Sequence, residues 1–387
     1  MTYPTPPPQR STYSTLTTSS GIRPAAPTPP KRRSRRWLAL PIAAAVVAAG
    51  FGGGLIASSV QNDPAPVVFQ QALPERVITA QPASSTVTPD TAAVGTTVIP
   101  SIVTVEVGNV TNGSFAVTGS GSGVVLDVDG NIATNDHVVA GGSEARVILS
   151  DGRIYDAELV GTDPLTDLAV LKVSTGDLTP IALGSTDDLV IGTPTIAVGS
   201  PLGLEGGPSL SVGVLSAVGR EVQTGPETIL YGMLQTDAPI TSGSSGGSLV
   251  DAEGKLIGIT TAVGVSAIGV EGIGFATPVE IVERVTSEII ATGSVSHALL
   301  GIGGDTAYDA TTDGGLAPVG VDVRDVTSGS AADAAGIIVG DVITAVDGTA
   351  VLTMDELITA LRRVGAGDIV EISLSDGRTV TPTLASR

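Results

Sequence analysis

The stretch Gly243-Ser244-Ser245-Gly246-Gly247 is the most informative part of the sequence, because it sets a serine among glycines that let the backbone turn tightly. Two stretches upstream complete the pattern, Thr134-Asn135-Asp136-His137-Val138-Val139 and Thr166-Asp167-Leu168-Ala169-Val170-Leu171-Lys172. A Ser hydroxyl becomes a nucleophile only when a neighbouring base takes its proton, and His suits that task. A carboxylate must then hold the imidazole in one tautomer. We therefore predict a triad of His137, Asp167 and Ser245.

The glycines around the serine predict an oxyanion hole. A tight turn aims the N–H groups of Gly243 and Ser245 at the charge that develops on a carbonyl oxygen under attack. Taken alone, Gly-Ser-Ser-Gly-Gly is typical of a flexible linker. Here, however, an apolar pair precedes a turn at 251–254 and a predicted strand at 255–261, and linkers do not lie between strands. The pattern indicates acyl transfer on a peptide carbonyl.

The chain resembles the HtrA (DegP-like) serine proteases of the trypsin fold, over roughly residues 96 to 387. The matching stretches are residues 121–125, 134–139, 159–172, 235–238, 243–247 and 272–276. The resemblance implies a mainly β protein, with a trypsin-like double antiparallel β-barrel followed by one PDZ domain. It also implies a serine endopeptidase of protein quality control, and a homotrimer. Interface aromatics are sparse, since Phe115 is the only one between residues 96 and 150.

The chain departs from the family beside the predicted nucleophile. Where the family reads Asn-Pro-Gly-Asn-Ser-Gly-Gly-Pro, residues 241–248 read Thr-Ser-Gly-Ser-Ser-Gly-Gly-Ser. Two serines thus replace two prolines, which would have fixed the backbone. We expect the loop to be held less firmly and the resting site to be loosely formed.

Substrate recognition follows only from the resemblance. It implies that Ile259, Thr260 and Thr261 pair with the substrate main chain and that Ile259 walls the primary specificity pocket. The alternative for Ile259 is an ordinary core residue. No Asp occupies the matching pocket floor at 239–242, which favours a small aliphatic side chain before the scissile bond.

Composition excludes several classes of protein. The chain has 387 residues, of which 42% are hydrophobic and 3% aromatic, and it has no cysteine. Disulfide scaffolds, thiol catalysis and Cys-zinc sites are therefore excluded. The formal net charge of −20 disfavours nucleic acid as a partner. We expect no cofactor and no metal.

The first 92 residues predict a tail, a membrane span and a tether. Residues 1–36 are rich in Pro, Ser and Thr, end in a basic cluster at 31–36 and are expected to be disordered and cytoplasmic. Residues 37–60 carry no charge and are long enough for a transmembrane helix. Residues 61–92 read as a linker. A cleaved signal peptide ending near Ser58 is the alternative. Both interpretations place the remainder outside the cytoplasm.

Residues 93–292 predict the protease domain. Short β-type runs separated by turns argue for antiparallel barrels. These runs are 102–107, 123–127, 146–150, 156–160, 168–173, 194–198, 213–218 and 256–261. A helix from Pro278 to about Thr292 should close the domain, with one apolar face formed by Ile281, Val282, Val285, Ile289 and Ile290.

Residues 293–387 predict the PDZ domain. The stretch 329–343 resembles the most recognisable part of HtrA-type PDZ domains, and Leu299-Leu300-Gly301-Ile302 resembles their carboxylate-binding loop. The resemblance implies that Leu300, Gly301 and Ile302 bind peptide C-termini beside a helix at 354–363. His297 is expected at the surface, without a role.

These expectations combine into a single-pass membrane protein with its protease and PDZ domains outside the cytoplasm, cleaving misfolded or unfolded envelope proteins. Its partners would be unfolded proteins or peptides and, at the PDZ domain, peptide C-termini. Two alternatives remain open at this point. One is a catalytically silent PDZ chaperone or scaffold, and the other is a regulatory protease of a single signalling substrate.

Overall fold

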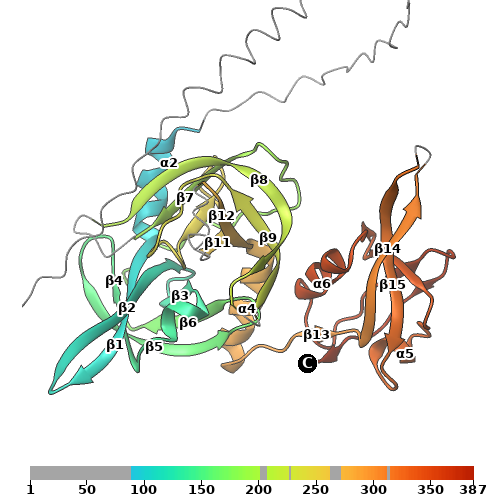
Figure 1. Ribbon diagram of the computed structural model, residues 1–387. Helices are drawn as coiled ribbons and strands as arrows, with labels where there is room; N and C mark the ends of the chain where they lie inside the picture. The colour runs from blue at the N-terminus through green and yellow to red at the C-terminus, as the bar shows by residue number, and fades with distance from the viewer. Residues whose placement is uncertain (1–88, 201–206, 226–227, 262–271, 312–313) are drawn as a thin grey trace, which may run out of the picture. The chain divides into compact units, whose positions relative to one another are not determined.

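The computed structural model describes residues 89–200, 207–225, 228–261, 272–311 and 314–387 (Figure 1). All of them belong to one unit of the chain, residues 81–387. The predicted tail, span and almost all of the linker lie outside the described residues. Among the described residues, no helix is both long and apolar enough to cross a bilayer.

The first part of the chain forms a closed antiparallel barrel of six strands in the order β1-β2-β3-β6-β5-β4. The short helix α2 (Thr91–Val98) and the 3-10 turn η1 (Ile99–Ser101) precede it. The strands are β1 (Ile102–Thr111), β2 (Ser114–Val125), β3 (Asn131–Thr134), β4 (Glu144–Ile148), β5 (Ile154–Asp163) and β6 (Leu168–Val173). Glycine is required inside this barrel, because a Cβ on Gly123 would lie 2.8 Å from the Ile132 side chain.

A second closed barrel follows, in the order β10-β11-β12-β9-β8-β7, drawn in green to yellow in Figure 1. Its strands are β7 (Pro194–Gly199), β8 (Ser209–Gln223), β9 (Ile229–Thr236), β10 (Ser248–Val250), β11 (Leu256–Thr261) and β12 (Gly274–Pro278). Apolar runs separated by tight turns form the strands, and closing each sheet into a barrel removes its open edges. The predicted double antiparallel barrel is confirmed.

Helix α4 (Val279–Thr292) ends the barrel region at Gly293, whose left-handed backbone (φ 80°) closes the helix. The predicted apolar face is buried through Ile289, whereas Ile290 is 39% exposed. Buried residues of α4 join residues of both barrels in a single core cluster that includes Ile102, Leu168 and Ile259. This shared core positions the two barrels against each other.

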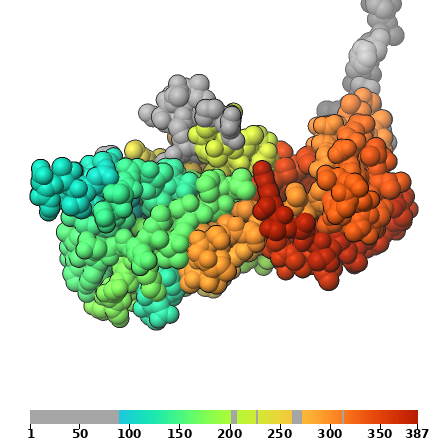
Figure 2. Space-filling model, turned by 90° about the horizontal axis from the view of Figure 1, so that it is seen from below, coloured from blue at the N-terminus to red at the C-terminus, as the bar shows by residue number. Residues whose placement is uncertain are grey.

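The C-terminal module has its own sheet and core and forms the deep orange and red surface in Figure 2. Five strands pair in the order β14-β15-β16-β18-β19, with β17 against β16, and β13 pairs with β20. The elements are β13 (Ala298–Leu299), β14 (Ile302–Ala310), β15 (Leu316–Val326), α5 (Ala331–Ala334), β16 (Val342–Val346), β17 (Thr349–Ala350), α6 (Met354–Arg362), β18 (Ile372–Leu374), β19 (Thr379–Val380) and β20 (Ala385–Ser386). Helix α6 begins at the predicted residue, where the Thr353 hydroxyl accepts from the Glu356 N–H.

Candidate active site

The residues His137 and Asp167 form a hydrogen-bonded pair. The imidazole lies on the single-turn helix α3 (Asp136–Val139), and its Nδ1 lies 2.9 Å from Oδ1 and 2.8 Å from Oδ2 of Asp167. The His137 backbone N–H also donates to Oδ1, at 3.1 Å. The Asp167 side chain is 9% exposed and the His137 side chain 48%. A buried carboxylate thus holds an imidazole that solvent and substrate can reach.

The pKa of His137 lies above its ordinary value. Burial by itself would lower the pKa, but the hydrogen bond and the charge of Asp167, together with the charge of Asp136, outweigh it. Because Nδ1 carries the proton that is donated to Asp167, Nε2 is left as the basic nitrogen. The pair has the arrangement that a general base of raised basicity requires.

The backbone of Asp167 is unusual, since its φ of 55° lies in the left-handed region. Asp tolerates this conformation better than most residues do. The buried Asn135 holds it there, because the Asn135 side-chain N–H donates to the Asp167 carbonyl at 2.7 Å. The same amide group lies 3.2 Å from the Thr261 hydroxyl, where β11 ends. Asn135 therefore ties the triad carboxylate to the second barrel.

The serine lies in a hydrogen-bonded turn between β9 and β10. The Ser244 N–H donates to the Thr241 carbonyl at 2.9 Å, and Gly243 has a φ of 90°. These features define a type II turn, which requires glycine at its third position. Ser245 is 5% exposed. The expectation of a loosely held loop stays a prediction, although Thr260 of β11 bonds this loop through its N–H, its carbonyl and its hydroxyl.

Sequence reasoning missed the residue that connects this loop to the first barrel. The Ser122 hydroxyl on β2 is completely buried, donates to the Gly243 carbonyl at 2.7 Å and accepts from the Ser200 N–H at 2.8 Å. Its backbone N–H donates to the Ser245 carbonyl at 2.7 Å. The only signal was its place in the Gly121-Ser122-Gly123 stretch, which we used for the resemblance alone.

The nucleophile loop and the histidine helix meet at β2. A Cβ on Gly121 would lie 2.7 Å from the side chain of Val138, next to His137, and 3.1 Å from the Ser245 carbonyl oxygen. The Thr134 hydroxyl, just before α3, donates to the Ser122 carbonyl at 2.7 Å. The structure thus brings all three predicted triad residues to the junction of the two barrels.

The residues predicted to bind the substrate main chain lie on β11. Thr260 and Thr261 are bonded to the nucleophile loop and to Asn135, as described above. Ile259 is fully buried in the core between the barrels. Neighbouring residues 262–271 lie outside the described residues. Direct contact of these three residues with substrate stays a prediction.

A groove of about 260 Å³ runs along α6 of the C-terminal module. Its walls include Leu299, Leu300, Gly301 and Ile302, the predicted carboxylate-binding loop, together with apolar residues of α6. Glycine is needed in this loop, because Gly301 has a φ of 83° and a Cβ there would lie 2.3 Å from the Ser330 Cβ. Leu300 is 2% exposed and belongs to the module's core.

The prediction for His297 is wrong. This residue is 6% exposed, and its Nε2 lies 2.9 Å from Oδ1 of Asp163 at the end of β5. The two residues are 134 positions apart, so no local motif could have signalled the contact.

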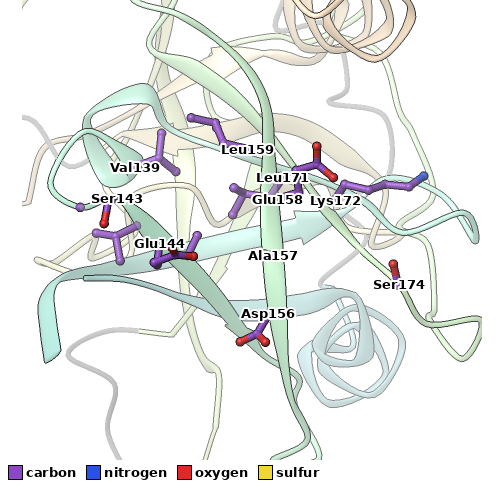
Figure 3. A pocket seen from close by; sticks show the side chains of 13 residues that line it. Val139, Ser143, Glu144, Asp156, Ala157, Glu158, Leu159, Leu171, Lys172 and Ser174 are labelled. Atoms are coloured by element: carbon purple, nitrogen blue, oxygen red, sulfur yellow. The ribbon is translucent and has the colours of Figure 1, made fainter. Parts of the chain in front are cut away.

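A separate hollow of about 450 Å³ lies on the first barrel, between β4, β5 and β6 (Figure 3). Its rim carries Glu144, Asp156 and Glu158 with Lys172, and no triad residue lines it. Among the described residues, no cluster of three or more His, Asp or Glu side chains could hold a metal ion.

Comparison with known proteins agrees with this geometry. A trypsin-like peptidase domain matches residues 121–259, and a PDZ domain matches residues 323–374. The serine protease PepD of Mycobacterium tuberculosis is 35% identical over 371 residues, which cover 88% of this chain and 75% of PepD. The serine protease Do-like HtrA of Lactococcus lactis subsp. cremoris is 37% identical over 289 residues, which cover 70% of this chain and 71% of the relative.

A solved structure of the HtrA-type protease AlgW with a tripeptide matches with a TM-score of 0.60 and 33% identity, covering 77% of this chain and 98% of that one. The fold, the His137–Asp167 pair and these relatives agree. The chain belongs to the HtrA family of trypsin-like serine proteases, as a serine endopeptidase with one PDZ domain.

Proposed function

We propose that this endopeptidase cleaves unfolded envelope proteins through His137, Asp167 and Ser245. The observation that carries the assignment is the His137–Asp167 pair, in which a buried carboxylate engages Nδ1 at 2.8 Å and leaves Nε2 as the base. In the proposed reaction, Nε2 takes the proton of the Ser245 hydroxyl as its oxygen attacks the peptide carbonyl. The imidazolium then gives that proton to the leaving amine, and water releases the acyl group by the reverse steps.

The loop at 241–245 supplies the proposed oxyanion hole. The Gly243 and Ser245 N–H groups are assigned to the tetrahedral oxyanion, where preorganised donors are most effective. Ser122 supports this assignment, because it anchors the Gly243 and Ser245 carbonyls from the other barrel.

The PDZ groove is proposed to bind peptide C-termini. Residues 299–302 line this groove together with apolar residues of α6, which is the arrangement of a carboxylate cradle beside a helix. The relative AlgW has been solved with a tripeptide, which supports a peptide as ligand for this protein too.

The location and assembly are proposals from sequence. An uncharged span at 37–60 behind a basic cluster supports a single-pass anchor with a cytoplasmic N-terminus. The family resemblance supports a homotrimer. A small aliphatic residue before the scissile bond fits the absence of Asp at 239–242.

A fluorophosphonate probe tests the catalytic assignment directly, because it reacts with a serine only when a base and an oxyanion hole activate it. We expect the full-length protein to be labelled at Ser245, and the Ser245→Ala protein to be unlabelled. Ser244→Ala is the matched control and should keep its label. A folded wild-type protein that takes up no label would favour the silent chaperone or scaffold instead.

A further inference from the structure

Both ring nitrogens of the buried His297 have a partner. Its Nδ1 lies 3.0 Å from a guanidinium nitrogen of Arg362 on α6 and 3.4 Å from one of Arg284 on α4. A guanidinium can only donate, so Nδ1 accepts. The ring proton is therefore on Nε2, which donates to Asp163. His297 thus joins two cations on one side to a carboxylate on the other.

Asp163 passes this contact on to the turn that presents the triad carboxylate. Asp163, the last residue of β5, pairs with Leu168, the first residue of β6. Residues 164–167 connect the two strands, and Asp167 is the last of them. The Asp163 carboxylate accepts from the Thr166 hydroxyl at 2.5 Å and from the Leu165 N–H at 3.2 Å. The loop is therefore built around the carboxylate that His297 holds.

The lowered pKa of Asp163 agrees with an ionised carboxylate that has a structural role. Burial by itself would raise the pKa of this 3% exposed carboxyl, but the hydrogen bonds from His297, Thr166 and Leu165 outweigh it and hold the pKa below its usual value. Without the His297 N–H, the buried Asp163 carboxylate would lose a hydrogen-bond donor. A buried charged group that loses a partner destabilises a fold by more than an average hydrogen bond stabilises it. The 163–167 turn would therefore rearrange.

The loop has a conformation that needs such support. Asp167 has its φ at 55°, and the Asn135 amide donates a hydrogen bond to its carbonyl. The Thr166 carbonyl accepts from the Thr277 hydroxyl at 3.4 Å, a long hydrogen bond. The hydrogen bond from the Thr166 hydroxyl to Asp163, at 2.5 Å, is the shorter of the two contacts that Thr166 makes.

We infer that His297 is a positioning residue of the protease, which acts through Asp163 to hold the 163–167 turn and so aims the Asp167 carboxylate at His137. The residue also lines the PDZ groove, beside Arg362. One imidazole thus belongs both to the groove wall and to the support of the triad. The inference rests on the proposed use of the triad and concerns the regulation of that same site.

Three substitutions in the full-length protein test the inference. His297→Leu keeps the volume and removes the donor. His297→Gln keeps an N–H near the position of Nε2. Arg363→Ala is the matched control, because Arg363 is exposed and links the PDZ helix to Asp187 and Glu280 without touching Asp163. This control measures the effect of weakening the contact between the two domains while the contact between His297 and Asp163 stays intact.

For a short peptide substrate, we expect His297→Leu to lower kcat by about tenfold to a hundredfold, as a small misplacement of a catalytic group does, with KM little changed. The acidic limb of the kcat/KM profile should move to lower pH, because a displaced Asp167 raises the pKa of His137 less. His297→Gln should restore most of the wild-type kcat and most of the wild-type position of the acidic limb. Arg363→Ala should leave kcat and the acidic limb unchanged. Equal loss in Arg363→Ala and His297→Leu would overturn the inference.

A second measurement does not need activity. The chain has two histidines, so His297→Leu leaves His137 as the only imidazole for an NMR titration. We expect a lower His137 pKa in this variant than in the wild type. An unchanged pKa would overturn the inference, and it would do so even if the wild type hydrolysed nothing and the proposed function failed. If His297→Leu does not fold, His297→Asn replaces it, since its amide oxygen can still accept from Arg362 but its side chain is too short to reach Asp163.

Discussion

Single residues set the chemistry of the site. His137 has a raised pKa because the bond to and the charge of Asp167 exceed the effect of burial, and Asp167 is held in a left-handed conformation by Asn135. A base of raised pKa takes a proton more readily, but is blocked by protonation at a higher pH. Both consequences can be measured.

The pH dependence of kcat/KM should show an acidic limb above the ordinary histidine pKa of about 6.5. Activity should fall as the pH drops through this limb, because protonated His137 cannot take the Ser245 proton. Asp167→Asn should lower kcat by about ten-thousand-fold and move the limb to lower pH, since the amide removes the charge and favours the wrong tautomer. A limb at the same pH in both proteins would contradict the assigned role of Asp167.

Elements bring these residues together, and β2 does so most directly. Its Ser122 hydroxyl satisfies the Gly243 carbonyl and the Ser200 N–H in a fully buried position. Buried polar groups that lose their partner are costly, whereas exposed groups turn to water. Replacing Ser122 by Ala, which removes one oxygen atom, therefore measures how strongly β2 stabilises the loop that carries Gly243 and Ser245.

Ser122→Ala should lower the free energy of unfolding by about 1–3 kcal/mol, because the buried Ser200 N–H and the partly buried Gly243 carbonyl lose their partner. It should also lower kcat more than it raises KM, since the oxyanion loop loses its anchor. Ser211→Ala is the matched control, because its exposed hydroxyl donates to the Pro239 carbonyl at 2.7 Å and water can replace it. Denaturant unfolding and peptide hydrolysis would check both. Equal effects of the two changes would refute the anchoring role of Ser122.

Sequence patterns predict the elements where apolar runs are bounded by turns. The predicted strands 168–173 and 256–261 have the bounds observed for β6 and β11. β2 begins at Ser114, nine residues before its predicted start, because the Asn112-Gly113 turn extends the hairpin with β1. Helix α2 has no strong apolar periodicity and was not predicted.

Local motifs predict the residues of the proposed triad, but not the residues that support them. The partners of Ser122 and His297 lie 121 and 134 residues away along the chain, so only the fold reveals them. Asn135 stood inside a quoted motif, yet its contact with the Asp167 carbonyl depends on the left-handed turn at 167. Candidate catalytic residues can be recognised from local sequence motifs. The residues that support them can be identified only once the packing of distant strands is known.

The whole molecule combines a protease domain with a PDZ domain. The groove on the PDZ side shares His297 with the support of the triad. A ligand in the groove can change the protease only by its difference in affinity between the active and resting states. Such couplings are about 1–3 kcal/mol.

A peptide with a free, hydrophobic C-terminus should therefore bind the groove and raise the protease rate by roughly five-fold to a hundred-fold. Amidating that C-terminus should remove both effects, because the N–H groups of the loop then lose the charge they bind. Calorimetry and peptide hydrolysis measure the two effects separately. Equal binding of the acid and the amide would refute the carboxylate site, and stimulation that persists in His297→Leu would place the coupling elsewhere.

The basic cluster before the uncharged span predicts the topology of the chain in its membrane. A protease added to intact cells should degrade the residues beyond about 61, while a tag at the N-terminus stays protected. Digestion of the tag from outside would contradict the proposed orientation. A mature protein beginning near Ser59 would show a cleaved signal in place of the anchor.

Hydrolysis of unfolded casein by the full-length protein, compared between the wild type and Ser245→Ala, is the decisive test of Ser245 as the nucleophile. We predict that the wild type cleaves casein and that Ser245→Ala loses activity on the order of a million-fold while keeping its circular dichroism and unfolding midpoint, because the other triad members act only through this oxygen. Wild-type activity in Ser245→Ala would contradict the entire site assignment.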